Sequence, residues 1–153
     1  MATTITPATL TTTISESITI NGQSMGSSNN LVITDIAEVF KRIVTIPTGT
    51  EVILYSTHDT DVAGSTFDDD LIKYVRITNK DGDNFIVIRI QDANGDEFVY
   101  KLDKYESFIL CSHTLSMNAE SAGVVGTVDA NIVSVKAKAD TAECDCEIFI
   151  ASI

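Results

Sequence analysis

The chain has 153 residues and a formal net charge of −12, from 22 acidic and 10 basic side chains. A single domain of this length buries roughly 68–70% of its unfolded surface, so it needs neither disulfides nor a metal ion for stability. Hydrophobic residues make up 44% of the chain, a composition that argues against disorder, collagen and coiled coil. Proteins that bind phosphate groups cluster Lys and Arg, and this chain does not. Neither nucleic acid nor an anionic membrane is therefore an expected partner.

The start of the chain and its cysteines indicate where the protein is made. Residues 1–13 lack both a basic stretch and a continuous apolar stretch, so they do not look like a signal peptide. No run of residues approaches the 18 or so apolar positions that span a bilayer. Three cysteines, an odd number, fit a reducing compartment better than a disulfide framework. We expect synthesis in a cytoplasm.

The N-terminal residues 1–13 are rich in Thr, which favours extended backbone because its branched Cβ restricts the side chain. They predict an extended arm or a first edge strand, which either pairs with a neighbouring subunit or frays. Residues 14–20 alternate apolar and polar side chains and predict a strand, although Glu16 interrupts the apolar face. Residues 21–30 are a predicted loop, in which Asn21-Gly22 is a strong turn signal.

The segment of residues 34–46 carries two conflicting signals. Four apolar side chains between positions 36 and 43 have helical spacing, and Asp35 with Glu38 has the pattern of a capping box. The β-branched residues ahead of the following proline favour extended backbone instead, because the residue before proline avoids the α region. We predict a short helical turn near Asp35 that leads into a strand over residues 41–46.

The stretch that most clearly identifies the fold class is residues 74–110. It contains three or four short segments in which apolar and polar residues alternate, joined by tight turns. Residues 80–83 predict one turn. Asn94-Gly95 predicts a type I′ hairpin, because both central positions of that turn need a positive φ. The stretch as a whole predicts a β-meander.

Further strands are predicted over residues 51–56, 132–139 and 143–150. In the last two, one face is apolar and the other is polar or charged, as in a half-buried antiparallel sheet. The predicted apolar face of residues 132–139 consists of Val133, Val135, Ala137 and Ala139. Eight or so short strands separated by turns predict an all-β fold, an antiparallel and jelly-roll-like β-sandwich. We divide the chain into an extended N-terminal arm, residues 1–13, and one sandwich domain, residues 14–153.

The candidate metal ligands are two pairs, Cys111-x-His113 and Cys144-x-Cys146. Each pair would lie on one face of a strand, and adjacent strands would bring four soft ligands around a zinc ion. Alternatively, Cys144 and Cys146 are small core residues, because free Cys is among the most buried residue types. A disulfide between these two is disfavoured, since residues i and i+2 of a strand lie at the limit of disulfide geometry. We predict no metal site and no cofactor.

Acidic side chains gather in turns, at residues 68–70, 81–83 and 92–96. The last group resembles part of a calcium loop, but its glycine position and the missing distal glutamate do not match an EF-hand. Hairpin turns also select Asn, Asp and Gly for backbone reasons alone.

For catalysis, His58 and His113 are the only candidate bases in the neutral range, and no hydrolase or phosphate-binding motif occurs. Paired carboxylates of a glycosidase stay an alternative, since a sequence does not reveal their separation. We expect no enzymatic activity.

Two parts of the chain resemble a known class of proteins. Residues 41–54 read KRIVTIPTGTEVIL, and the strands that follow read YVRITN, NFIVIRI, EFVYKL and ESFIL. Together with the C-terminal AKADTAECDCEIFIASI, they resemble small β-rich structural proteins in the virions of tailed bacteriophages. The resemblance covers residues 41–153 and contains no catalytic signature. Capsid decoration (cement) proteins and tail or fibre components both belong to this type.

The resemblance implies a non-enzymatic role in assembly, in several copies, on the virus particle. The function that it favours is capsid decoration, in which the protein binds the outer capsid surface and stabilises the particle. The implied partners are the major capsid protein or other virion proteins, with a homo-oligomer, preferably a trimer. A tail or fibre component and a module that binds a receptor or carbohydrate are the alternatives. The receptor- or carbohydrate-binding module is poorly supported, because such sites usually offer an aromatic surface and this chain has no Trp and four Tyr.

The predicted contacts with other subunits or with the capsid lie in the N-terminal arm, because an extended segment adds a strand to an open sheet edge. Closed symmetry would hide such edges, which otherwise invite aggregation. The predicted contact residues are Thr3, Thr4, Ile5, Thr6, Thr9, Leu10, Thr11, Thr12 and Thr13. The predicted location of the protein is the virion.

Overall fold

The computed structural model describes residues 5–58, 67–68, 70–112, 115–117 and 130–153. In these residues the chain forms fourteen strands and no helix, so the predicted all-β class is confirmed. This described part accordingly contains no helix that could cross a membrane.

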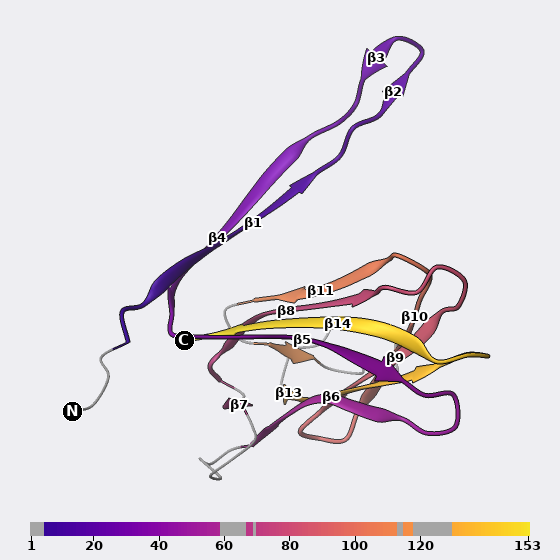
Figure 1. Cartoon of the computed structure of the whole chain (residues 1–153). Helices are drawn as coiled ribbons and strands as arrows, with labels where there is room; N and C mark the ends of the chain where they lie inside the picture. The colour runs from indigo at the N-terminus through magenta and orange to yellow at the C-terminus, as the bar shows by residue number, and fades with distance from the viewer. Residues whose placement is uncertain (1–4, 59–66, 69, 113–114, 118–129) are drawn as a thin grey trace.

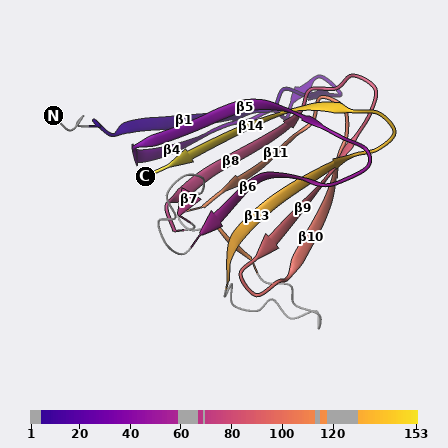
Figure 2. The ribbon, with the colours of Figure 1, turned by 60° about the horizontal axis from the view of Figure 1, so that its bottom comes forward.

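Two sheets make up the body of the molecule (Figures 1 and 2). The four-stranded sheet has the order β11 (Ser107–Cys111), β8 (Ile72–Asn79), β14 (Cys144–Ser152) and β5 (Glu38–Ile46). The six-stranded sheet has the order β10 (Glu97–Leu102), β9 (Ile86–Asp92), β13 (Ala130–Ala139), β6 (Val52–His58) and β7 (Phe67–Asp68), with β12 (Ser116–Met117) beside β13. Neighbouring strands are antiparallel, except for β6 and β7.

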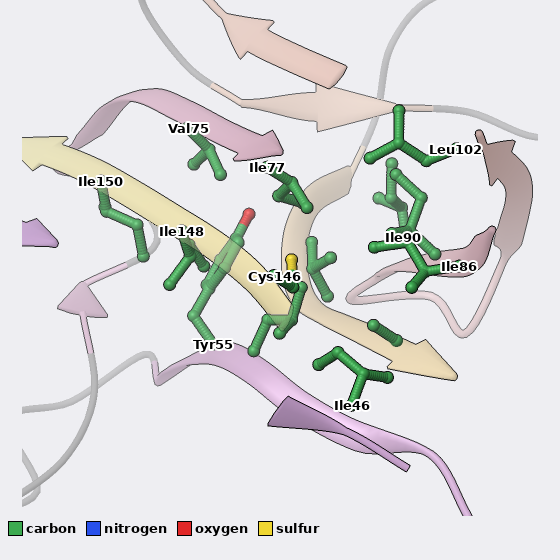
Figure 3. Close-up of a cluster of buried hydrophobic side chains, with 14 of the residues drawn as sticks. Ile46, Tyr55, Val75, Ile77, Ile86, Ile90, Leu102, Cys146, Ile148 and Ile150 are labelled. Carbon is green, nitrogen blue, oxygen red and sulfur yellow. The ribbon is translucent and has the colours of Figure 1, made fainter. Parts of the chain in front are cut away.

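The two sheets face each other across one hydrophobic core, as in a β-sandwich (Figure 3). Alternate residues of each strand point into this core, because successive side chains of a strand lie on opposite faces of the sheet. Ile77 and Ile148 from the four-stranded sheet and Ile86 and Ile90 from the six-stranded sheet are almost fully buried. Burial of one such side chain contributes roughly 1.5–3 kcal/mol. The jelly-roll connectivity stays a prediction.

Two of the three connections in the predicted meander cross from one sheet to the other. Strands β8 and β11 lie in the four-stranded sheet, and β9 and β10 lie in the six-stranded sheet. Only β9 and β10 form a hairpin, from Gln91 opposite Glu97 to Ile86 opposite Leu102. All four strands are present, but the predicted β-meander is wrong. Alternation specifies which side of a strand is buried and does not specify the strand with which it pairs.

The predicted type I′ turn at Asn94-Gly95 is also wrong. Gly95 has a positive φ of 89°, whereas Asn94 does not have a positive φ. Backbone hydrogen bonds from Gly95 N to Asp92 O (3.2 Å) and from Asp92 N to Asp96 O (3.1 Å) close a longer loop. A single left-handed residue is typical of hairpin loops with more than two residues.

No helical turn forms near Asp35. Strand β4 (Ser28–Ile36) runs through this residue, and β5 begins at Glu38. Asp35 adopts a left-handed conformation with φ 63°, which a short polar side chain tolerates. The predicted strand over residues 41–46 is confirmed and extends further towards the N-terminus. Pairing of all nine residues of β5 with β14 outweighs the local helical spacing.

Strand β13 contains an irregularity that changes its buried face. Its register with β9 shifts between Ile132 and Ser134. Ile132 and Val135 are therefore both buried in the core, while Val133 is partly exposed. The predicted apolar face is wrong at Val133 and correct at Val135, Ala137 and Ala139.

Candidate assembly interface

A long hairpin extends away from the body (Figure 1). Strands β1 (Ala8–Ser15) and β4 pair antiparallel along it, and β2 (Thr19–Ile20) with β3 (Gln23–Ser24) forms its tip. We call residues 8–36 the arm. The turn at the tip is Asn21-Gly22, where both residues have a positive φ, 50° and 79°. These are the values that a two-residue type I′ turn requires, as the turn signal predicted.

The arm differs from what the sequence predicted in the bounds of its strands and loop. Residues 14–20 do not form one strand, because β1 ends at Ser15 and β2 begins at Thr19. The predicted loop over residues 21–30 is shorter, since β3 and the start of β4 lie within it. The boundary placed between residues 13 and 14 falls inside β1.

The two faces of the arm differ in polarity. Residues opposite each other in an antiparallel pair lie on the same face. One face carries Leu10 opposite Ile33, Thr12 opposite Leu31 and Ile14 opposite Asn29. The other face is mostly polar, with Thr11 opposite Val32 and Thr13 opposite Asn30. An apolar stripe therefore runs along one face from the base of the arm outwards.

The base of the arm packs on the outer face of the four-stranded sheet. Ile36 is buried against Tyr74 and Ala151, with Leu10 and Ile33 beside them. Tyr74 also contacts Phe149 edge-on, with ring centroids 5.9 Å apart. A backbone hydrogen bond from Ala37 N to Ser152 O (3.0 Å) ties the end of the arm to β14. The base is therefore part of the folded body.

Beyond its base the arm exposes large apolar side chains. Met25 is 64% exposed, Val32 58% and Ile20 53%. Ile14, Ile18 and Leu31 are also exposed. Monomeric soluble proteins rarely expose large contiguous apolar patches, which mark interaction sites, and Ile14 and Leu31 share one face of the arm. The outer part of the arm is therefore the candidate functional site.

The arm has negative charge and no positive charge. Glu16 and Asp35 are its only ionisable side chains, and the first basic residue of the chain is Lys41. Ser27 Oγ donates a hydrogen bond to the Glu16 carboxylate (2.7 Å), and Glu16 N donates to Ser27 O (2.8 Å). The backbones approach so closely there that a Cβ on Gly26 would collide with Glu16 O. The Glu16 carboxylate is thus held in place near the tip without a cation.

The predicted contact residues lie ahead of this arm in the sequence or in its first strand. Thr3 and Thr4 are outside the described residues, and Ile5 and Thr6 precede β1 and are exposed. On β1, Leu10 and Thr12 are half-buried and the other predicted contacts are exposed: Thr9, Thr11 and Thr13. The sequence prediction missed the larger apolar residues further along the arm. A usable signal was present, because six of them interrupt a polar region of the sequence: Ile14, Ile18, Ile20, Met25, Leu31 and Val32.

The structure does not bring the candidate zinc ligands together. Cys111 lies opposite Tyr74 on β8, and Cys146 lies opposite Asn79 at the other end of that strand. Their positions are five residues apart along β8, or about 16 Å. His113 is outside the described residues. Within the described part of the chain, no three His, Cys, Asp or Glu side chains are grouped to hold a metal ion.

The acidic turns use their carboxylates to organise the backbone. Asp81 Oδ1 accepts hydrogen bonds from Asn84 N (2.6 Å) and Asp83 N (2.8 Å), which lower the pKa of this carboxyl. Asp92 Oδ1 accepts hydrogen bonds from Asn94 N (3.0 Å) and Asp96 N (2.8 Å). Side chains of this type mimic a turn of the backbone. These contacts give Asp81 Oδ1 and Asp92 Oδ1 a structural role in their turns.

In the folded protein, Cys111 alone is expected to react with iodoacetamide near pH 8, because thiolate is the reactive form. Cys111 is exposed. Burial raises the pKa of the Cys146 thiol to about 12 and also raises that of Cys144. Intact-mass spectrometry should find one adduct on the native protein and three after denaturation, since the chain has three cysteines. Two or three adducts on the native protein would contradict the buried positions of Cys144 and Cys146.

Comparisons with protein-family models, with curated proteins and with solved structures each found no match to this chain. The arm is therefore identified as the candidate site from its geometry, polarity and exposure alone.

Proposed function

We propose that this chain is a non-enzymatic virion structural protein that decorates the outer surface of a capsid and stabilises the particle. The observation that carries the proposal is the arm, whose outer part exposes an apolar surface. The resemblance of residues 41–153 to small virion proteins of tailed bacteriophages supports the same role. The proposed partners are further copies of this chain, in a trimer, and the major capsid protein or other virion proteins.

The arm needs a partner for a physical reason. A two-stranded hairpin alone is at best marginally stable in water, and only the base of this one packs on the body. Covering one exposed Ile or Met would contribute roughly 1.5–3 kcal/mol. A surface that covered Ile18, Ile20 and Met25 would therefore stabilise both the hairpin and the contact. Components of a repeating shell offer such surfaces in many copies.

The charge of the chain is compatible with this role. A net charge of −12 favours solubility and opposes non-specific association. A protein that covers the outside of a particle has most of its surface in water. Specific contacts would then be confined to the arm, which combines apolar side chains with few charges.

One observation favours the alternative of a ligand-binding module. A cavity of about 300 Å³ lies between β10 and β11, with Phe98, Phe108 and Met117 among its walls. Glu97 and Ser116 are the polar residues that line it. Binding sites for sugars need several convergent polar groups beside an aromatic surface, so this cavity fits a sugar poorly. Assembly is therefore the better proposal.

Shortening the arm is expected to convert an oligomer of this protein into monomers. The variant joins Thr12 to Leu31 through a two-residue Asn-Gly turn. It keeps the cross-strand pair of Leu10 and Ile33 at the base of the arm. The body should stay folded, because the contacts of Ile36 are untouched. Sedimentation velocity should give a monomer for the variant and a trimer for the full chain. An unchanged sedimentation coefficient would contradict the role of the arm.

A second variant and the virion itself complete the test. Replacing Ile18, Ile20 and Met25 with Ser keeps the hairpin and removes its apolar tip, so it should also weaken the oligomer.

Particles purified by density gradient from infected cells should contain the full chain by mass spectrometry, and antibody labelling should place it on the capsid. Absence from the particles would overturn the virion role, and labelling of the tail would support the tail alternative.

A further inference from the structure

The edge of β5 is open along its whole length. Strand β5 is the last strand of the four-stranded sheet, and its nine residues pair with β14 on one side only. Strand β6 is also open over most of its outer edge, since β7 pairs only with Thr57 and His58. Within the described part of the chain, no strand pairs with the outer edge of β5, and β7 alone pairs with that of β6. Unpaired backbone N–H and C=O groups of this kind are a template for an added strand.

A groove of about 500 Å³ lies between these two open edges. Glu38, Phe40 and Arg42 line it from β5, and Leu54 and Tyr55 line it from β6. Its lining is mixed, because Leu54 and Tyr55 are buried in the core and Phe40 packs against that core, while Glu38, Arg42 and Ser56 add polar groups. A strand added to β5 would place every second side chain over this groove.

Arg42 and Glu38 place one positive and one negative side chain along the β5 side of the groove. The Arg42 side chain is exposed, and its guanidinium lies 5.4 Å from the centre of the Phe40 ring. No carboxylate of the described residues forms an ion pair with it. The neighbouring Lys41, by contrast, lies 3.4 Å from the Glu147 carboxylate. Arg42 is therefore available to an acidic partner.

We propose that the groove between β5 and β6 receives the arm of a second copy of this chain, which adds a strand to the edge of β5. This inference rests on the proposed function and names the surface that the arm occupies. Strands β1 and β4 have eight and nine residues, which match the nine of β5. Among the described residues, each also has an open outer edge, because the two pair only with each other.

The polarity of the arm fits the groove. With the arm beside β5, its apolar face, with Ile14 and Leu31, turns towards the groove and its Thr-rich face turns towards solvent. Near its tip the arm contributes the Glu16 carboxylate and no cation, so an ion pair with Arg42 would orient the arm away from Glu38 of the groove. Main-chain hydrogen bonds supply affinity in this type of contact, and side-chain pockets supply specificity.

The occupant is a second copy because the arm of the same copy points elsewhere. Leu10, Ile33 and Ile36 hold the base on the outer face of the four-stranded sheet, and the arm then leads away from the body (Figure 1). Arm and groove are different surfaces, so the contact is head-to-tail. Contacts of this type close into rings when the rotation between copies allows it, which is consistent with the proposed trimer.

Cross-linking between two kinds of copies tests the inference. Cys111→Ser removes the exposed thiol from both kinds. One kind carries Ile14→Cys in the arm and a size tag, and the other carries Ile53→Cys, which replaces an exposed residue that lines the groove from β6. A matched control carries Lys138→Cys, which replaces an exposed basic residue on the outer face of the six-stranded sheet. The tagged arm copies are mixed at equal concentration with the groove copies in one reaction and with the Lys138→Cys copies in another. Both mixtures are treated with a short bismaleimide.

The Ile53→Cys copies should give about ten times more of the mixed cross-linked product than the Lys138→Cys copies, because docking raises the local thiol concentration. Equal yields, or a higher yield at Lys138→Cys, would overturn the groove as the receptor. The protein with the shortened arm separates a failure of this inference from a failure of the proposed function. If shortening abolishes the oligomer while cross-linking favours Lys138→Cys, the proposed function stands and the groove is wrong. If the oligomer survives shortening, the proposed role of the arm fails as well.

Discussion

Replacing Asn79 with Leu is expected to lower the free energy of unfolding by roughly 3 kcal/mol or more, since each buried polar group left unpaired costs about 1–3 kcal/mol. Asn79 is fully buried. Its Nδ2 donates hydrogen bonds to Asn84 O (2.8 Å) and Leu102 O (3.3 Å), and its Oδ1 accepts one from Asp81 N (3.0 Å). Leu has a similar size and can satisfy none of these three groups.

The position of Asn79 makes this loss a test of the fold. Asn79 ends β8 just before the chain crosses from the four-stranded to the six-stranded sheet, and its amide contacts the end of β10. Urea denaturation measures the change in free energy. The control is Asn94→Leu, the same substitution at an exposed turn position, where a change below about 0.5 kcal/mol is expected. Similar losses for both variants would mean that the Asn79 hydrogen bonds contribute little.

Replacing Ile148 with Ala is expected to lower the free energy of unfolding by roughly 2–5 kcal/mol, because the substitution removes buried methylene and methyl groups and leaves a cavity. Ile148 has no exposed surface. It lies on β14, opposite Ile77 of β8, and its side chain points into the core between the sheets (Figure 3). Strand β14 has neighbours on both sides, so it has little room to shift into the cavity.

Ile43→Ala is the matched control for this substitution. Ile43 lies on the adjacent strand β5, and its side chain is 59% exposed. The expected loss is below about 0.5 kcal/mol, as for most surface substitutions. Urea denaturation of both variants at the same pH gives the comparison. If Ile43→Ala costs as much as Ile148→Ala, the outer face of β5 is covered in solution, as it would be in an oligomer.

The candidate site was partly predictable from the sequence. The Thr-rich start of the chain correctly indicated an extended segment, and Leu10 and the threonines of β1 lie in the arm. The partner strand β4 was not recognised, because Asn and Ser at its start are typical of loops. Exposed Ile18 and Met25 look like core residues in a sequence, and only their position in space reveals that the described part of the body does not cover them.

The sequence by itself determined the all-β class, most strands of the body and most buried faces. Alternation in β9 and β14 and the Asn21-Gly22 turn depend on interactions within a few residues, so the local pattern contains them. Only the tertiary structure decided which strands pair, how β8 to β11 divide between two sheets, and that residues 8–36 leave the body as an arm. Pairing of β14 with β8 joins residues about 70 positions apart, and contacts over such separations depend on the whole chain, which no local pattern records.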